Sequence, residues 1–384
     1  MVRIIDALLL WSLLSFAAMS ALSGQFRDAQ LAAREGEVAG HPVIATFADA
    51  EYRKKGISLF GVRTMMEDRR GVIWLSDAFS LCSYDPDRNK WLNLTSDFKK
   101  SLGFERFDSV KYIAEDARGR IWVKTVSQGC AYFDGVTWHR ARELFPGYLK
   151  ADPDFFFLGN DAKLWFWFPE GLVGYDGEEW TQTFQPPIDI KWVYVQGRKG
   201  DSLPPNPHNS GDDKPMREAF CGFQNREGLI WLGSRNALLT FDPRTKNWEL
   251  ALLPVEMEYV YHIYEDRISR LWFGDLDSDI AVYNKHKNQW TFYNMATYFP
   301  QIRPETARFY QEKSGRMMLA TDAGLLLFDE AQNKWKLFTA NNSNRLLGYD
   351  LTCIMEDKRG RIWISAEGGI LLLSGEQSKK QLDR

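Results

Sequence analysis

The chain has 384 residues, of which 45% are hydrophobic and 14% aromatic, so it is long enough to bury a large core. Its 48 basic and 51 acidic residues are mixed along the whole sequence and give a net charge of −3. Because no basic block or stripe occurs, nucleic acid is excluded as a partner.

The first residues differ from the rest of the chain. Arg3 is followed by an apolar run over residues 7–22 and then by the small residues Ser23 and Gly24. This pattern predicts a secretory signal peptide over residues 1–23 and a periplasmic or secreted protein. An uncleaved membrane anchor is the alternative, and only in that form would the chain meet a membrane. It is disfavoured because the run of 16 residues is shorter than the roughly 20 that span a bilayer. Residues 24–41 are polar and expected to be loose.

A motif then repeats along the chain. Residues 65–76 read MMEDRRGVIWLS, residues 113–124 read IAEDARGRIWVK, and residues 354–365 read IMEDKRGRIWIS. The residues at the anchor position of the motif are Trp74, Trp122, Trp165, Trp231, Trp272, Met318 and Trp363. Their spacings of 48, 43, 66, 41, 46 and 45 residues are typical of a propeller or a helical array.

Strand chemistry decides between these two architectures. Each unit has short runs of β-branched and aromatic residues broken by turn residues, whereas no helical period occurs after Leu22. We expect four strands per unit. The first ends at the acidic pair, the second carries the anchor, the third ends in an aromatic residue followed by Asp, and the fourth begins with a second Trp. The sequence therefore predicts an all-β fold, a single seven-bladed β-propeller of four-stranded blades.

The acidic pair has a structural interpretation. Asp-x-x-Gly, as in Asp116 to Gly119, forms a tight turn in which the Asp side chain accepts a backbone N–H group and Gly adopts the left-handed conformation. The paired carboxylates also fit acid–base catalysis, but they recur in nearly every unit, while an active site is needed only once. The recurring Trp residues are expected to pack blade against blade.

The seventh unit lacks its fourth strand. The segment PVIATF at residues 42–47 precedes the first unit as WKLFT precedes the seventh. We therefore expect this N-terminal strand to complete the last blade and close the ring, which removes exposed sheet edges. The predicted propeller covers residues 42–373, with a polar tail at 374–384.

The unit I-x-E-D-x-x-G-x-I-W-[IL], with its aromatic-Asp strand end, resembles the two-component regulator propeller repeat. The resemblance covers roughly residues 42–373. It implies a propeller like those of the periplasmic sensor regions of hybrid sensor kinases, which are associated with extracellular carbohydrate. The chain departs from that architecture because no immunoglobulin-like region, later membrane span or kinase follows the repeats. The family supplies no fixed ligand residues.

Ligand-binding candidates come from the predicted top face, where the loops after the anchor strands surround the pore. The residues at these positions vary between units, which fits both a specific site and neutral drift. The candidates on these loops are Asp77, Phe168, Arg235, Asp275, Asp322 and Glu367.

Two further features lie on the same predicted face. An insertion at residues 186–215 carries Trp192 and Tyr194 and fits either a lid or a flexible loop. Asp275, Asp277 and Asp279 alternate in a loop that could hold Ca²⁺, although it lacks the Gly and distal Glu of an EF-hand. A solvated loop is the simpler interpretation, so we expect no metal and no cofactor.

The sequence thus predicts an exported, non-catalytic binding propeller for an extracellular small molecule or carbohydrate. A protein–protein platform is one alternative. An enzyme similar to streptogramin lyases, which are also seven-bladed, is another. None of the five His residues lies on a loop after an anchor, and no Ser-His-Asp or Cys-His pattern occurs. Cys82, Cys130, Cys221 and Cys353 lack metal-ligand spacing and are expected to be buried thiols.

Overall fold

A computed structural model describes residues 37–186, 219–234, 237–252, 257, 259–275, 279–300, 306–339 and 350–375. The predicted signal peptide, most of the insertion at 186–215 and nearly all of the tail at 374–384 lie outside these residues. Within the described part of the chain, no helix has both the length and the apolar character that a membrane crossing requires.

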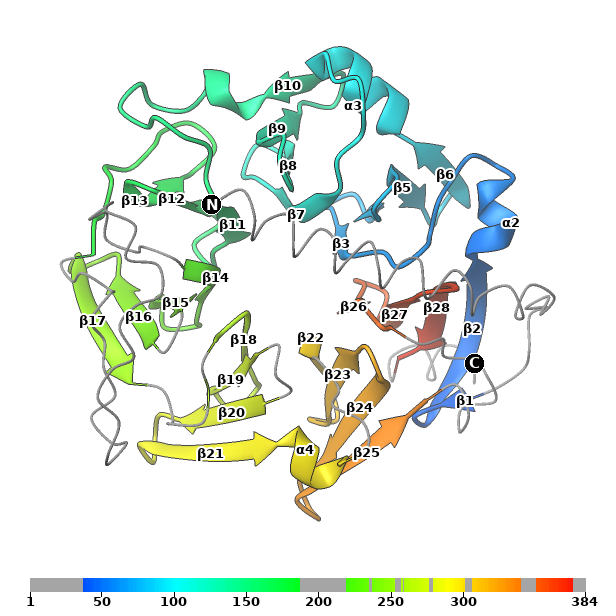
Figure 1. Cartoon of the computed structure of the whole chain (residues 1–384), viewed down its shortest axis with the longest axis vertical. Coiled ribbons are helices and arrows are strands. Elements are labelled where there is room, and N and C mark those ends of the chain that lie inside the picture. Colours follow the sequence, from blue (N-terminus) through cyan, green and yellow to red (C-terminus); the bar gives the residue numbers. More distant parts are fainter. Residues whose placement is uncertain are drawn as a thin grey trace, which may run out of the picture. The chain divides into compact units, whose positions relative to one another are not determined.

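Seven antiparallel sheets, the blades, follow one another around a ring, as the sequence predicts (Figure 1). The first strand of each blade is innermost. Each innermost strand contacts the innermost strands of both neighbouring blades, so the ring is closed at its centre. The innermost strands are β3, β7, β11, β14, β18, β22 and β26.

The first four blades contain the following strands. Blade 1 has β3 (Thr64–Glu67), β4 (Ile73–Ser76), β5 (Leu81–Asp85) and β6 (Lys90–Asn93). Blade 2 has β7 (Val110–Glu115), β8 (Ile121–Thr125), β9 (Cys130–Phe133) and β10 (Trp138–Arg140). Blade 3 has β11 (Phe155–Leu158), β12 (Leu164–Phe168) and β13 (Gly171–Tyr175). Blade 4 has β14 (Ala219–Gln224), β15 (Ile230–Ser234), β16 (Ala237–Asp242) and β17 (Asn247–Leu252).

The remaining blades complete the ring. Blade 5 has β18 (His262–Glu265), β19 (Arg270–Gly274), β20 (Asp279–Asn284) and β21 (Gln289–Asn294). Blade 6 has β22 (Thr306–Gln311), β23 (Met317–Thr321), β24 (Gly324–Asp329) and β25 (Lys334–Phe338). Blade 7 has β26 (Cys353–Glu356), β27 (Arg361–Ala366) and β28 (Gly369–Ser374), joined by β2 (His41–Ala48) and β1 (Glu37–Val38).

Blade 3 departs from the four-strand rule. In place of a fourth strand, the segment after β13 makes two isolated bridges, Tyr175 to Trp180 and Leu172 to Phe184. The connections also contain short helices, which the sequence analysis does not foresee: α2 (Asp49–Arg53), α3 (Thr95–Leu102), α4 (Met295–Tyr298) and the 3-10 helix η1 (Ala141–Glu143). These helices are only one or two turns long, too short to produce a clear helical period in the sequence.

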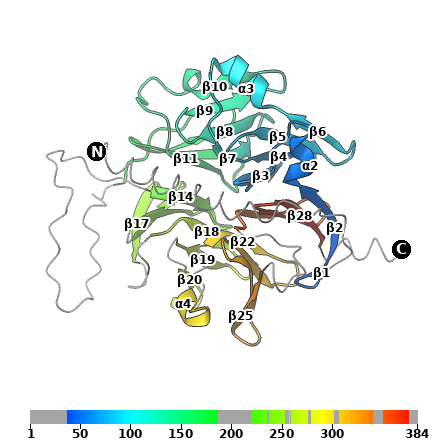
Figure 2. The same cartoon turned by 45° about the vertical axis from the view of Figure 1, so that its right-hand side comes forward.

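The ring closes as predicted. Strand β2 pairs antiparallel with β28, with Phe47 opposite Ile370, and Figure 2 shows the two strands side by side. Strand β1, which the sequence analysis does not predict, adds a fifth strand to blade 7. Strand β1 and the first residue of β2 lie in the segment at 24–41 that we expect to be loose; the start of that segment lies outside the described residues.

The repeated aspartate holds its turn and the anchor Trp together. In blade 2, Asp116 Oδ1 accepts the backbone N–H groups of Arg118 and Arg120, both at 2.9 Å. Asp116 Oδ2 accepts the Trp122 Nε1–H group at 2.8 Å and the Arg120 Nε–H group at 2.6 Å. Blades 5 and 7 repeat this arrangement around Asp266 and Asp357. The carboxylate therefore has a structural function.

The repeated glutamate joins neighbouring blades. Glu115 of blade 2 accepts the backbone N–H group of Arg69 in the blade 1 turn, at 2.7 Å. Glu265 makes the same contact with Arg226, and Gln311 makes it with Arg267. Because these turns surround the centre of one face, the hydrogen bonds hold adjacent blades together at that face. We call this the bottom face and the opposite one the top face.

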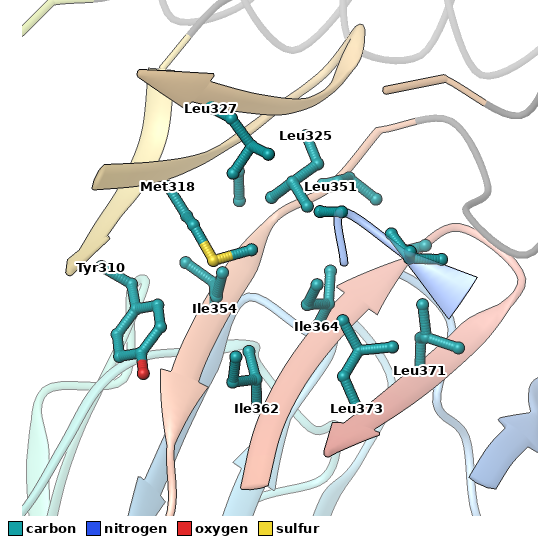
Figure 3. Packing of buried hydrophobic residues seen from close by; sticks show 14 residues of the cluster. Tyr310, Met318, Leu325, Leu327, Leu351, Ile354, Ile362, Ile364, Leu371 and Leu373 are labelled. Atoms are coloured by element: carbon teal, nitrogen blue, oxygen red, sulfur yellow. The ribbon is translucent and has the colours of Figure 1, made fainter. Parts of the chain in front are cut away.

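The hydrophobic core is divided among the blade interfaces. Each of the seven clusters of buried apolar side chains draws residues from two neighbouring blades. Between blades 6 and 7, Met318 and Leu327 pack toward Ile354 and Ile364 (Figure 3). A single blade cannot bury its faces alone, so the blades stabilise one another.

Candidate functional site

Three of the predicted top-face residues are buried and line no opening. Asp77 is fully buried, and its Oδ1 accepts the N–H groups of Phe79 and Ser80, both at 2.7 Å. Phe168 is fully buried, with its ring centre 5.1 Å from that of Phe145. Asp275 is buried and accepts the Asp279 N–H group. The fold uses these side chains for turns and core packing, and their prediction as ligand contacts stays a prediction.

Two predicted residues remain accessible and lie near one another. Asp322 is exposed and Glu367 is half-buried. The Asp322 carbonyl oxygen accepts the Asp350 N–H group at 2.7 Å. Burial raises the pKa of Glu367, and the nearby charge of Asp350 raises it further. Asp350 thus links the two predicted residues, and the sequence analysis did not single it out.

Four predicted residues, Trp192, Tyr194, Arg235 and Asp277, lie outside the described residues. Across the described ranges, no three His, Cys, Asp or Glu side chains are grouped so as to hold a metal ion. The proposed calcium site needs Asp277, so it is untested.

The innermost strands bring one side chain per blade to the same level of the ring. In every blade, the residue two positions after the anchor pairs with one residue of the innermost strand. We call these seven partners the channel layer: Thr64, Tyr112, Phe155, Cys221, His262, Arg308 and Cys353. Arg308 is the one member that always carries a charge.

Arg308 contacts two neighbours in the channel layer. Its Nη1 lies 2.9 Å from His262 Nδ1, and it also hydrogen-bonds with the Cys353 thiol. Since a guanidinium group only donates hydrogen bonds, His262 Nδ1 accepts, and the imidazole is neutral. Burial, reinforced by the Arg308 charge, holds the pKa of His262 well below its ordinary value. Burial also raises the pKa of Tyr112 to about 12.

A cavity of about 470 Å³ lies beside this layer. Its wall includes Arg308 of blade 6 and Phe157 of blade 3, which come from opposite sides of the ring, so the cavity lies in the central channel. Four basic side chains line it, Arg69, Lys111, Arg308 and Lys358, with two carboxylates, Glu67 and Glu115. Cavities of this size hold small ligands in other proteins.

Charged side chains surround the top end of the channel. Burial, together with the charges of Lys124 and Arg63, lowers the pKa of Lys111. Burial raises the pKa of Asp154, and the charges of Lys124 and Lys111 oppose this increase. This end therefore combines closely spaced cations with the carboxylate of Asp154.

Aromatic rings add a second surface at the top end. Phe220 is the second residue of β14, the innermost strand of blade 4, and lies at a β-bulge. Tyr259 and Tyr261 precede β18. The Phe220 and Tyr261 rings stack with centres 4.8 Å apart, and those of Tyr259 and Tyr261 lie 6.0 Å apart. All three side chains are half-buried. Bulges often re-aim side chains next to functional sites.

A larger hollow of about 1130 Å³ lies between the outer strands of blade 6 and residues 39–40. Its charged floor is already used for ring closure. His41 Nε2 lies 2.7 Å from Glu312 Oε1, and Arg316 Nη2 lies 2.9 Å from the same oxygen. The central cavity is the better ligand site because two of its basic groups, Arg308 and Lys111, have no carboxylate at ion-pair distance among the described residues.

The sequence contains a signal for the channel layer. Counting two residues past each anchor and pairing across the first hairpin gives all seven positions, because the hairpin register is nearly constant. The pairing register shifts between Thr306 and Arg308, and no local motif predicts this shift.

A comparison with protein-family models supports the repeat found in the sequence. The family model described as two component regulator propeller matches residues 345–368, the last unit of the ring. The chain carries the two-component regulator propeller repeat. A comparison with curated proteins finds no match.

Solved structures of bacterial extracellular and surface proteins are similar to this chain. One is the extracellular domain of the putative hybrid two-component system BT3049 from B. thetaiotaomicron, with a TM-score of 0.60, 16% identity, and coverage of 83% of this chain and 40% of that one. Another is PorZ of Porphyromonas gingivalis, a surface component of the type-IX secretion system, with a TM-score of 0.60, 15% identity, and coverage of 84% and 48%. This chain therefore spans less than half the length of either.

A lyase shares the fold as well. Virginiamycin B lyase from Staphylococcus aureus has a TM-score of 0.55 and 12% identity, with coverage of 82% of this chain and 94% of the lyase. Identities this low establish the fold alone, so the site must decide the function.

Proposed function

We propose that this chain is an exported, non-catalytic binding propeller that takes an extracellular ligand, with oligosaccharides as the class to test first. The observation that carries the proposal is the combination of the stacked rings of Phe220, Tyr259 and Tyr261 with a central cavity below them. Aromatic faces offer rigid apolar area to the C–H faces of sugars, and polar groups around them fix orientation. Export follows from the predicted signal peptide.

The accessible carboxylates belong to the proposed site. Asp322 and Glu367 would contribute acceptors for sugar hydroxyl groups on the side of blades 6 and 7. The sequence predicts Trp192, Tyr194 and Arg235 as further ligand contacts, and we keep them in the proposed site. The titratable groups of the channel support binding over catalysis, because His262 is neutral and its Nδ1 already accepts a hydrogen bond from Arg308.

A thermal-shift screen of the purified protein against neutral and acidic oligosaccharides tests this proposal. A ligand that binds only the folded state raises the melting temperature by mass action. We expect at least one hit, weakened by Phe220→Ala and by Tyr261→Ala. Tyr298→Ala on α4, 39% exposed, is the matched control and should leave the shift unchanged.

A hit that Phe220→Ala and Tyr261→Ala leave intact would remove the proposed site. A screen without any hit would contradict oligosaccharide binding and favour the protein-platform alternative.

A further inference from the structure

The guanidinium group of Arg308 has no carboxylate at ion-pair distance among the described residues. Its contacts are the neutral ring of His262 and the thiol of Cys353. Arg308 is half-buried in the channel. A cation withdrawn from water is costly unless a counter-charge or several acceptors compensate it. A guanidinium has five N–H donors in a planar fork, so two acceptors leave most of them for another partner.

The neighbours of Arg308 within the channel layer supply no negative charge. Thr64 and Cys221 are neutral members of the channel layer, and Tyr112, with a pKa of about 12, keeps its proton at neutral pH. The two carboxylates in the cavity wall are committed at the bottom-face turns. Glu67 accepts the Lys358 N–H group at 2.6 Å, and Glu115 accepts the Arg69 N–H group at 2.7 Å.

The cavity therefore has an excess of positive charge. Four basic side chains and two carboxylates line its volume of about 470 Å³. Arg69 lies 3.9 Å from Glu115 and Lys358 Nζ donates to the Asp68 carbonyl oxygen, so Arg308 and Lys111 carry the excess. Lys111 lies in the same wall. Burial and the charges of Lys124 and Arg63 lower its pKa, and the carboxylates of Asp108 and Asp154 oppose this shift. A low-dielectric cleft lined by one sign of charge concentrates ligands of the opposite sign.

We propose that the central channel binds the anionic group of a ligand, a carboxylate or a sulfate, against the guanidinium of Arg308. Both groups match the planar fork of arginine and form charge-assisted hydrogen bonds with it. Lys111 attracts the anion at the channel wall, and Arg308 holds it. This inference rests on the proposed function and narrows it, because an acidic sugar would place its ring toward Phe220 and Tyr261 and its acid group in the channel.

Calorimetric titration of the purified protein at fixed ionic strength tests the inference. The probes are galacturonate, its neutral counterpart galactose, and sodium sulfate. We expect galacturonate to bind at least about tenfold more tightly than galactose, the scale of one good charge-assisted contact. Sulfate that competes with galacturonate would show that the anion alone suffices, and sulfate that does not compete would show that the sugar ring is also needed.

Variants locate the contact. Arg308→Gln should weaken galacturonate binding about tenfold or more. Lys111→Gln, at an exposed side chain, should cause a smaller loss and provides the test if Arg308→Gln fails to fold. Arg244→Gln removes a cation from the exposed β16–β17 turn, where it pairs with Asp242, and should leave binding unchanged.

The His262 ring gives an independent readout. An anion on Arg308 should shift the imidazole nitrogen resonances of His262, whereas an anion bound elsewhere should leave them unchanged. Equal binding of galactose and galacturonate would overturn this inference and leave the proposed function standing. Galacturonate binding that neither Arg308→Gln nor Lys111→Gln weakens would also overturn it. Absence of binding by all three probes, with no hit among the oligosaccharides, would overturn both.

Discussion

In blades 1, 2, 5 and 7, one buried aspartate divides its oxygens between the turn backbone and the anchor Trp. One oxygen accepts backbone N–H groups, and the other accepts the indole N–H group, at 3.0 Å for Asp68 and Trp74. Burial alone would raise the pKa of Asp68, but the hydrogen bonds from Trp74 and Arg70 outweigh burial and lower this pKa. In blade 4, Asn225 takes this position. Its amide nitrogen cannot accept, and Trp231 Nε1 is buried without a partner among the described residues.

This comparison predicts the effect of Asp116→Asn. The amide keeps the turn acceptor but presents donors to Trp122 and Arg120, which leaves buried groups unsatisfied. We expect a loss of about 2–4 kcal/mol in the free energy of unfolding, measured by urea denaturation. Asp329→Asn, at an exposed turn, is the control and should cost less than about 0.5 kcal/mol. A cost for Asp116→Asn as small as the control's would contradict the structural role.

The exposed turn aspartates behave differently. The N–H groups of Thr137 and Val136, and then the His139 ring, hold the pKa of Asp134 at about 2, below its ordinary value of 3.8. Since this pKa is depressed, the stability that Asp134 contributes is present above its ordinary pKa and is lost as pH falls toward 2. We expect an NMR titration to place Asp134 near 2, and His139→Ala to raise the value only in part. A return to 3.8 in that variant would show that the backbone bonds contribute little.

Among the elements, the first hairpin of each blade controls the ring. Its strands set the register of the channel layer, and its first strand ends in the glutamate that reaches the preceding blade. The sequence predicted these hairpins well, because Asp, Gly and Trp impose them locally. It could not predict the missing fourth strand of blade 3 or the short helices, which depend on packing between connections. The burial of Phe168 could not be predicted either, because it depends on Phe145, which lies on the connection before blade 3 and packs against it.

The hydrogen bond that the repeated glutamate makes to the neighbouring blade can be tested separately. Blade 6 already uses Gln311, whose Oε1 accepts the Arg267 N–H group at 2.7 Å. Glu115→Gln should therefore change the free energy of unfolding by less than about 0.5 kcal/mol, because the amide oxygen keeps the bond. Glu115→Ala should cost about 1–2 kcal/mol, because the Arg69 N–H group loses its acceptor. If Glu115→Gln and Glu115→Ala lower the free energy of unfolding equally in urea denaturation, the charge and not the hydrogen bond holds the blades together.

At the scale of the whole molecule, closure joins the two ends of the repeat array. Besides the pairing of β2 with β28, His41 bridges blades 7 and 6. Its Nδ1 lies 2.8 Å from the Ser374 carbonyl oxygen and its Nε2 2.7 Å from Glu312. The sequence predicted the closing strand from the repeat count. It could not predict the bridge, because Met318 replaces the anchor Trp in blade 6 and frees Glu312 for another partner.

Removal of this bridge should weaken the ring. His41 is 2% exposed and Glu312 is 2% exposed, so His41→Ala leaves a buried carboxylate with Arg316 and the Ser314 hydroxyl as its remaining partners. We expect a loss of about 2–4 kcal/mol in thermal unfolding. His139→Ala removes an exposed pair with Asp134 and should cost less than about 1 kcal/mol. Similar costs for the two variants would show that closure depends on β2 alone.

The most direct test of the account is a crystal structure of the protein with galacturonate or with the best oligosaccharide from the screen. We predict electron density for the ligand in the central channel, with an acid group against Arg308 and a ring near Phe220 and Tyr261. Density confined to the outer hollow of blade 6 or to the bottom-face turns would contradict the account.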